Sequence, residues 1–205
     1  MKLYTAPHAP NPRRVAMFMA EKGIADIEII SLNLLEGEHK TDVFTKKSPL
    51  SQTPVLELDD GRCLTESRAI CQYLEALHPE PNLMGADPFE RAFIEMWDRR
   101  MELLFSMPLM LWVRHGNPVL AVLEREQNAD VAAYNQAQAM RMAKWLNGEL
   151  ATRDWIAGDR FTIADITAAC GMDFARLMKW RPGEDLPNLA AWRQRLADRP
   201  ASKAA

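Results

Sequence analysis

Apolar positions follow two different periods along the chain, and the change between them divides it near residue 80. In the first part, short runs rich in β-branched residues alternate with stretches of helical spacing. The order of strand, helix, strand, helix, hairpin and helix predicts a compact α/β layer. Strands are predicted at residues 2–6, 27–32, 55–58 and 62–64, helices at 12–22 and 66–77, and a short helix or irregular turn at 39–47.

From residue 88 onward the apolar spacing is helical, and no strand is predicted. A stripe of large apolar side chains predicts a long first helix, which Pro108 is expected to kink or end. The stripe consists of Phe89, Phe93, Met96, Trp97, Met101 and Leu104. Further helices are predicted at about 129–150, from 162 and from 188. The stretch HPEPNLMGADP has the composition of a linker, so we expect domains at 1–80 and 88–205 joined by residues 81–87.

Two helix starts carry local signals. Asn11 is predicted to cap the first helix, with Pro12 at the first helical position, where a missing N–H costs nothing. FTIADI at 161–166 is a capping box, in which the side chains of Thr162 and Asp165 each accept from the other's backbone N–H. Structure alone explains this second motif, so neither residue is a candidate catalyst.

Composition excludes several function classes. The chain has 205 residues, a formal net charge of -3 and scattered basic residues, which argues against a nucleic-acid partner. Basic pairs such as Arg13–Arg14 and Arg99–Arg100 are expected on solvated helix faces. No apolar run is long enough to span a membrane and the start lacks the apolar core of a signal peptide, so a cytoplasmic protein is expected.

The three cysteines show no metal-like or CxxC spacing. They are Cys63, Cys71 and Cys170, and we expect all three to be small buried apolar side chains. No metal site is therefore predicted.

Two short stretches combine a structural interpretation with a chemical one. In SQTPVLEL, spacing alone favours a trans Pro54 that opens an edge strand, and a cis Thr53–Pro54 bond is the alternative. In TESRAI, Thr65 or Ser67 could simply cap the helix. Alternatively, Ser67 and the first-turn N–H groups bind a carboxylate while Glu66 pairs with an ammonium, which together would recognise an amino-acid end.

Four motifs together resemble the glutathione transferase superfamily, especially its bacterial, theta-, zeta- and nu-like members. They are SPLSQTPVLEL, LTESRAICQYLE, the Pro-rich linker and WIAGDRFTIADI, and they occur in the family's order and spacing. The resemblance implies a thioredoxin-like α/β domain that binds glutathione, followed by an all-α domain that shapes the second-substrate pocket. It also implies a homodimer packed between one subunit's α/β domain and the other's helices, in which Arg99 or Arg100 could reach the partner's glutathione.

The resemblance assigns residues to both substrates. Glu66 and Ser67 match the positions that hold the γ-glutamyl end, and Thr53 precedes the family's cis proline. The glutathione-binding set implied in this way is Asn11, His39, Lys40, Gln52, Thr53, Pro54, Glu66 and Ser67. The set expected to line the second-substrate pocket, where core packing is the alternative, is Met107, Leu111, Trp112, His115, Phe174 and Met178.

The chain departs from the family at the residue that activates the thiol. A cysteine-like thiol with a pKa of about 8.5 is only a few per cent ionised at pH 7. The position of the activating serine falls on Ala9, which has no donor, and Asn11 is the remaining side-chain donor. We therefore expect a glutathione-dependent transferase that attacks an electrophile or a mixed disulfide. A non-catalytic binding protein of the same fold is the alternative, which Ala9 favours.

Overall fold

The computed structural model describes residues 1–204, so only Ala205 of the predicted domain at 88–205 lies outside it. A mixed four-stranded sheet with the order β2-β1-β3-β4 forms the N-terminal region, where β1 runs parallel to β2 and antiparallel to β3. Its elements are β1 (Lys2–Thr5), α1 (Pro10–Lys22), β2 (Glu28–Ser31), η1 (Glu38–Lys40), α2 (Asp42–Thr45), β3 (Val55–Glu57), β4 (Cys63–Leu64) and α3 (Ser67–Leu77).

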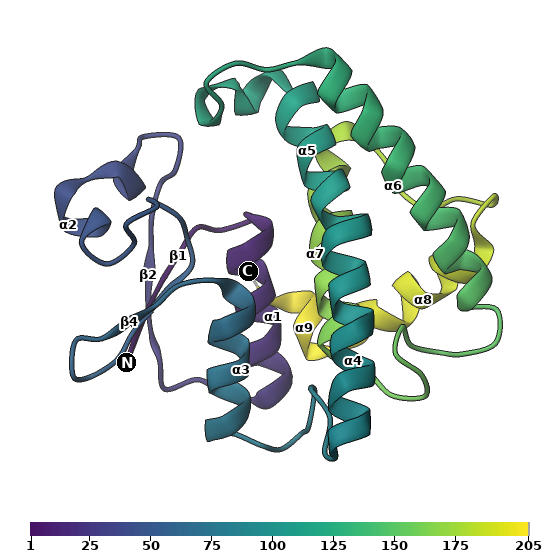
Figure 1. Cartoon of the computed structure of the whole chain (residues 1–205), viewed down its shortest axis with the longest axis horizontal. Helices are drawn as coiled ribbons and strands as arrows, with labels where there is room; N and C mark the ends of the chain where they lie inside the picture. Colours follow the sequence, from purple (N-terminus) through teal and green to yellow (C-terminus); the bar gives the residue numbers. More distant parts are fainter. Residues whose placement is uncertain (205) are drawn as a thin grey trace.

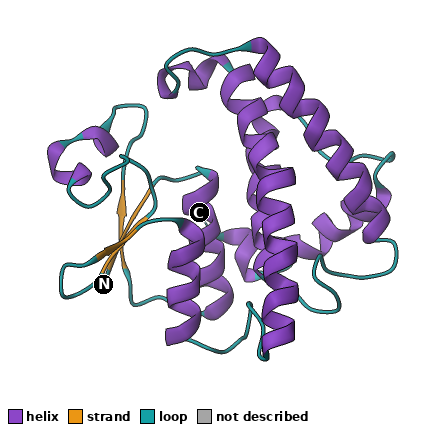
Figure 2. Ribbon diagram, viewed as in Figure 1, coloured by secondary structure: helices purple, strands orange, loops and turns teal. Residues whose placement is uncertain are grey.

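The C-terminal region is helical. Its elements are α4 (Pro88–Arg100), η2 (Met101–Ser106), α5 (Met107–Gly116), η3 (Pro118–Leu123), α6 (Ala129–Glu149), α7 (Ile163–Ala175), η4 (Arg176–Met178), α8 (Pro187–Ala197) and α9 (Pro200–Lys203). Figure 2 shows the sheet at one side of the molecule and helices over the rest. The predicted fold class, an α/β layer followed by an all-α region, is confirmed. Among residues 1–204, no helix has both the length and the apolar composition required to cross a bilayer.

Helices α1 and α3 lie between the sheet and the C-terminal helices, whereas α2 lies on the other side of the sheet (Figure 1). The side chains of Val15, Phe18 and Ile70 are fully buried there. Helix α1 also packs against α7 and against the short C-terminal helix α9. Burial of apolar surface on both sides therefore holds α1 in the middle of the molecule.

Polar contacts hold the C-terminal segment to α1. The Arg199 guanidinium donates to Glu21 Oε2 at 2.6 Å, and the Ala201 N–H donates to Glu21 Oε1 at 3.0 Å. The Arg13 guanidinium donates to the carbonyl of Ala204 and, at 3.0 Å, to Asp173 on α7. Arg13 is therefore half-buried in a polar cluster and does not lie on a solvated helix face, as the sequence had indicated.

Pro108 does not end the long helix, because residues 88–116 are helical without a break. A π-helical segment, η2, ends at Ser106, two residues before Pro108, and the Met107 N–H donates to the Glu102 carbonyl five residues back. This wider turn makes room for a residue that lacks an N–H donor.

Helix α1 begins earlier than predicted. Ala9 is its extended N-cap residue, and the Arg13 N–H donates to the Ala9 carbonyl at 3.0 Å. Pro10 takes the first helical position because its ring already fixes a helical φ. The prediction that Asn11 caps the helix is therefore wrong: Asn11 is the second residue of the helix, and no side chain caps it.

Two further predictions about polar and apolar positions need correction. Helix α3 is capped neither by Thr65 nor by Ser67, because Glu66 occupies the N-cap position with a φ of 65°. Cys71 and Cys170 are buried as predicted, whereas Cys63 is half-buried on the two-residue edge strand β4, which nothing covers completely.

The capping box of α7 is confirmed and lies in the centre of the helical region. Asp165 Oδ2 accepts from the Thr162 N–H at 2.9 Å, and Oδ1 accepts from the Ile156 N–H at 2.9 Å and from the Trp192 indole at 2.8 Å. Burial raises the pKa of Asp165 to about 6, and these hydrogen bonds counteract part of that effect. One carboxylate thus joins three segments of the helical region.

We expect Asp165→Asn to lower the free energy of unfolding at pH 7 by about 3 kcal/mol, because an amide leaves at least one buried donor unpaired. The folded-state pKa exceeds the unfolded-state value of about 3.9, so the folded state binds more protons between these values. The stabilisation by Asp165 should therefore fall by up to about 2.7 kcal/mol as the pH rises from about 4 to about 6. Urea denaturation of both proteins across this range measures the difference; a constant difference would contradict the raised pKa.

Candidate active site

The turn before α1 brings the start of this helix to the surface between the two regions. His8 adopts a left-handed conformation with a φ of 67°, and the Ala9 N–H donates to the Ala6 carbonyl at 3.2 Å. Within the first turn of the helix, Pro10 and Pro12 have no N–H, and the Arg13 N–H is already bonded to Ala9. Asn11 therefore provides the free donors of this turn, its backbone N–H and its amide group.

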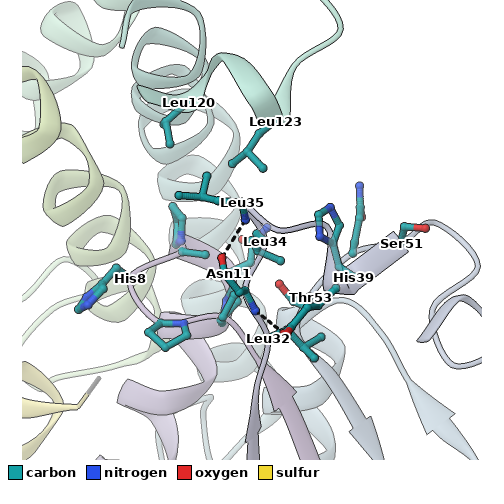
Figure 3. Close-up of a pocket in the computed structure, with 18 of the residues that line it drawn as sticks. His8, Asn11, Leu32, Leu34, Leu35, His39, Ser51, Thr53, Leu120 and Leu123 are labelled. Atoms are coloured by element: carbon teal, nitrogen blue, oxygen red, sulfur yellow. Dashed lines mark hydrogen bonds between the residues drawn. The ribbon is translucent and has the colours of Figure 1, made fainter. Parts of the chain in front are cut away.

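A cavity of about 960 Å³ opens beside this turn, between the loops of the N-terminal region and the helices of the C-terminal region. Figure 3 shows Leu120 and Leu123 on one side of it, with Leu34, Leu35 and Asn11 on the side that faces them. We refer to it as the large cavity. From the N-terminal region it is lined by residues 6–12, 31–36, 38–40 and 50–53, and from the C-terminal region by Met110, Arg114, Leu120, Leu123, Phe174 and Leu177.

A second, smaller hollow of about 40 Å³ adjoins the large cavity, and we refer to it as the small hollow. Both are lined by Asn11, Leu50, Gln52 and Thr53. Beyond these shared residues, the small hollow is lined by Ser48, Pro49, Pro54, Thr65, Glu66 and Ser67. The start of α1 therefore lies where a polar hollow meets a cavity whose walls carry several leucines.

The structure brings the predicted glutathione-binding residues together. His39 and Lys40 line the large cavity, Pro54, Glu66 and Ser67 line the small hollow, and Asn11, Gln52 and Thr53 line both. The peptide bond between Thr53 and Pro54 is cis, as the resemblance implied and as spacing alone did not favour. The role of these eight residues in glutathione binding stays a prediction.

The loop before Pro54 is held by Ser48, which the sequence analysis missed. Ser48 is buried, and its Oγ donates to the Gln52 carbonyl at 2.8 Å and accepts from the Gln52 N–H at 3.0 Å. The backbone of residues 48–52 is therefore closed into a ring that presents Gln52 and Thr53 to both cavities. The sequence signal for this closed loop would have been a serine four residues before Gln52, whose hydroxyl can bond the backbone of the same loop.

His39 is buried to 9% exposure at the wall of the large cavity, and its Nδ1 has no hydrogen-bond partner within residues 1–204. Burial, together with the charge of neighbouring Lys40, lowers the pKa of His39 below its usual value. The ring is therefore neutral at pH 7, and an anion bound beside it would reverse that shift.

Ser67 and Glu66 differ in exposure although they are neighbours. Glu66 is exposed, whereas Ser67 is buried, and its Oγ accepts from Arg14 Nη1 at 2.9 Å. Arg14 Nη1 also donates to Glu102 Oε1 at 2.9 Å. Arg14 was expected on a solvated helix face, but it is only 3% exposed, because its place on α1 faces α3 and the helical region. Nothing in the local sequence distinguishes it from Arg13.

Of the residues predicted to line the second-substrate pocket, only Phe174 lines the large cavity. The other five, Met107, Leu111, Trp112, His115 and Met178, are not among its lining residues. The face of α5 that meets the cavity carries Met110 and Arg114 instead, one helical turn apart. His115 Nδ1 accepts from the Asn128 N–H at 3.2 Å, so it stabilises the start of α6.

Arg114 organises the segment that covers the large cavity. Its guanidinium donates to the Leu123 carbonyl at 3.0 Å and pairs with Glu124. The Gln127 amide in turn donates to the carbonyls of Arg114 and Asn117 at 2.7 Å each. These bonds hold Leu120 and Leu123 over the cavity. The sequence did not predict this, because residues 118–123 form a 3₁₀ segment without the apolar spacing of an α-helix.

Comparison with known proteins identifies the family of this arrangement. The model of the glutathione S-transferase N-terminal domain matches residues 3–82, and the model of the C-terminal domain matches residues 104–200. The chain belongs to the glutathione S-transferase family. Among residues 1–204 of this family member, no three His, Cys, Asp or Glu side chains are grouped to hold a metal ion.

Relatives resemble this transferase over nearly its whole length. It is 35% identical to glutathione S-transferase 2 of Saccharomyces cerevisiae, over 99% of this chain and 88% of the yeast protein. The crystal structure of Gtt2 from the same yeast matches with a TM-score of 0.93, covering 99% of each chain at 35% identity. A glutathione S-transferase domain-containing protein of Marinobacter aquaeolei also matches with a TM-score of 0.93, at 39% identity and over 98% and 99% of the two chains.

Proposed function

We propose that the protein is a glutathione-dependent transferase. It activates the thiolate of bound glutathione, which attacks an apolar electrophile or a mixed disulfide. The observation that carries the proposal is the position of Asn11, at the junction of a polar hollow and a large, leucine-lined cavity. A tripeptide that extends from the small hollow past Asn11 would present its central thiol to the large cavity. Such a division between an anchoring site and a reaction site is what a two-substrate transfer requires.

The polar groups suit the two ends of glutathione. In the small hollow, Glu66 offers a carboxylate to the γ-glutamyl ammonium, and Ser67 offers a hydroxyl to its carboxylate. At the other end, His39 and Lys40, with Gln52 nearby, offer donors to the glycyl carboxylate. The main chain of Thr53 lies between the two ends and can pair with the cysteinyl backbone.

Asn11 is the group that we assign to the thiol, in place of the serine that Ala9 replaces. Lowering a thiol pKa by two units takes about 2.7 kcal/mol of selective stabilisation of the anion. A hydrogen bond to a charged acceptor contributes roughly 1.5–3 kcal/mol, and the N-terminus of a helix adds about 0.3–1 kcal/mol. Because Asn11 does not cap α1, its amide is available for this contact.

The chemistry itself needs no further protein group. In conjugation, the sulfur lone pair forms a bond to the electrophilic carbon, and the leaving group departs with the electrons of the broken bond. In thiol–disulfide exchange, the glutathione thiolate forms a new S–S bond and the other thiolate leaves. The apolar side chains of Leu120, Leu123 and Phe174 would favour second substrates of low polarity.

We further propose that two copies pair through the outer face of α4 and η2. Leu103 and Leu104 are 55% and 54% exposed there, and Met96 and Met107 are also exposed. Contiguous exposed apolar residues of this kind mark interaction sites. Arg99 pairs with Glu102 and Arg100 stacks at 4.9 Å on Trp97, so both arginines are engaged within their own chain.

If Asn11 stabilises the thiolate, Asn11→Ala should lower kcat/KM roughly 10–100-fold and raise the thiol pKa of bound glutathione. Asn11→Asp, which keeps the shape but adds a negative charge, should raise that pKa further. The thiolate absorbance of the complex, titrated with pH, measures both effects. Unchanged turnover and thiol pKa in Asn11→Ala would remove Asn11 from the mechanism.

Ala9→Ser provides the complementary gain-of-function variant, because a hydroxyl at this position should raise the rate of conjugation.

A calorimetric titration of the unmodified protein with glutathione tests the proposal as a whole. Absence of binding at millimolar glutathione would exclude the transferase. Binding without turnover would favour the non-catalytic alternative that Ala9 suggests.

If His39 binds the glycyl carboxylate, the affinity for S-methylglutathione should rise as the pH falls below about 6.5, because the bound anion raises the pKa of His39 and binding takes up a proton. S-methylglutathione has no thiol, so thiol ionisation does not contribute. Calorimetry in buffers of different ionisation enthalpy counts the proton. His39→Gln should bind without this pH dependence; a dependence that survives the substitution would assign it to another group.

If α4 and η2 form the dimer contact, Leu104→Glu should convert a dimer into a monomer, because a buried unpaired carboxylate is costly. Val43→Glu is the matched control, since Val43 is 73% exposed on α2, at the other side of the sheet. Sedimentation velocity of the two variants and the unmodified protein measures the association state. A dimer that persists in Leu104→Glu, or an unmodified protein that is monomeric, contradicts this interface.

A further inference from the structure

A buried cation lies directly behind the small hollow. Arg14 belongs to the second turn of α1, where it is 3% exposed. Its Nη1 atom lies 2.9 Å from Ser67 Oγ and 2.9 Å from Glu102 Oε1. One guanidinium group thus connects α1, the first residue of α3 and the π-helical segment η2 of the helical region.

This contact determines the direction of the hydrogen bonds that Ser67 makes. A guanidinium carries donors only and stays charged at all working pH values. Ser67 Oγ must therefore accept from Arg14, which leaves the hydroxyl hydrogen to be donated elsewhere. Within residues 1–204 the Ser67 hydroxyl donates to no acceptor, although Ser67 is only 4% exposed. The remaining direction is the small hollow, which Ser67 lines.

Arg14 is the cation in direct contact with that hydroxyl, and its positive charge is only partly offset by the neighbouring carboxylate of Glu102. Glu102 accepts from Arg14 through Oε1 and pairs with Arg99 through Oε2, so its charge is shared between two arginines. A donor that is itself hydrogen-bonded to a cation is polarised and becomes a stronger donor toward an anion. An uncharged acceptor gains much less from this arrangement.

We propose that Arg14 is a positioning residue that holds Ser67 as a donor for a carboxylate, and so makes the small hollow selective for the α-carboxylate of the γ-glutamyl group. The inference rests on the proposed glutathione function. It adds that selectivity for this carboxylate depends on a residue that does not touch the ligand, and on Glu102 from the other region of the chain.

The experiment compares three ligands by calorimetry. They are S-methylglutathione, its analogue without the α-carboxylate and its analogue without the α-amino group. The unmodified protein should bind S-methylglutathione roughly 10–100-fold more tightly than the analogue without the carboxylate, as expected for a hydrogen bond to a charged group. We call this ratio of affinities the carboxylate ratio, and the corresponding ratio for the analogue without the α-amino group the amino ratio. Arg14→Met keeps a similar side-chain volume and should reduce the carboxylate ratio to about threefold or less.

The remaining measurements separate a positioning role from a merely structural one. Ser67→Ala should reduce the same ratio, and combining it with Arg14→Met should reduce the ratio no further. The preference for the α-amino group, which Glu66 would provide, should persist in Arg14→Met. Arg13→Met is the matched control, because Arg13 contacts Asp173 and the C-terminal segment and should leave both ratios unchanged.

Glu102→Gln keeps an acceptor for Arg14 but removes one of the two negative charges that act on it, since the buried carboxylate of Asp98 remains. The carboxylate ratio should therefore rise a few-fold, and this variant stays informative if Arg14→Met fails to fold. The inference is overturned if Arg14→Met weakens all three ligands equally or leaves the carboxylate ratio intact, or if Glu102→Gln does not raise that ratio. If the unmodified protein binds none of the three ligands, the glutathione function itself has failed.

Discussion

The burial of helix α1 between the sheet and α7 is the constraint on which the rest of the structure depends. Apolar side chains such as Val15 and Phe18 hold its middle, and Glu21 and Arg13 attach it to the C-terminal segment. A helix held in this way cannot shift without exposing apolar surface or breaking buried ion pairs. Its first turn is therefore presented at a defined place between the two regions.

That placement gives the start of α1 two neighbours of opposite character. The small hollow offers polar groups from Glu66 and Ser67, and the large cavity offers leucines from both regions. Asn11 lies on both walls, with donors that its own helix does not use. A donor that is already fixed at this junction would stabilise a bound thiolate without having to reorganise first.

Much of the fold followed from local patterns. The strands, the hairpin and the capping box at Thr162 were predictable because their signals lie within a few residues of one another. The continuous helix through Pro108 was not, because the π-helical turn before it depends on packing against α7. There Ser106 Oγ donates to the Thr167 carbonyl at 2.6 Å. The start of α1 was misjudged because Pro10 and Pro12 offer equivalent signals two residues apart.

The sequence by itself determined which residue types were available: a Thr-Pro pair before a strand, an acidic and a hydroxyl residue at the start of α3, and an alanine where the family has a serine. Only the tertiary structure decided which of them meet. Arg13 and Arg14 are neighbours in the chain, yet one contacts the C-terminal segment and the other contacts Ser67. Likewise, Met110 and Arg114 face the large cavity while Trp112 is buried in the core. Helical periodicity shows which residues share a face, but the partner of each face depends on how the helices pack, and that is a property of the whole chain.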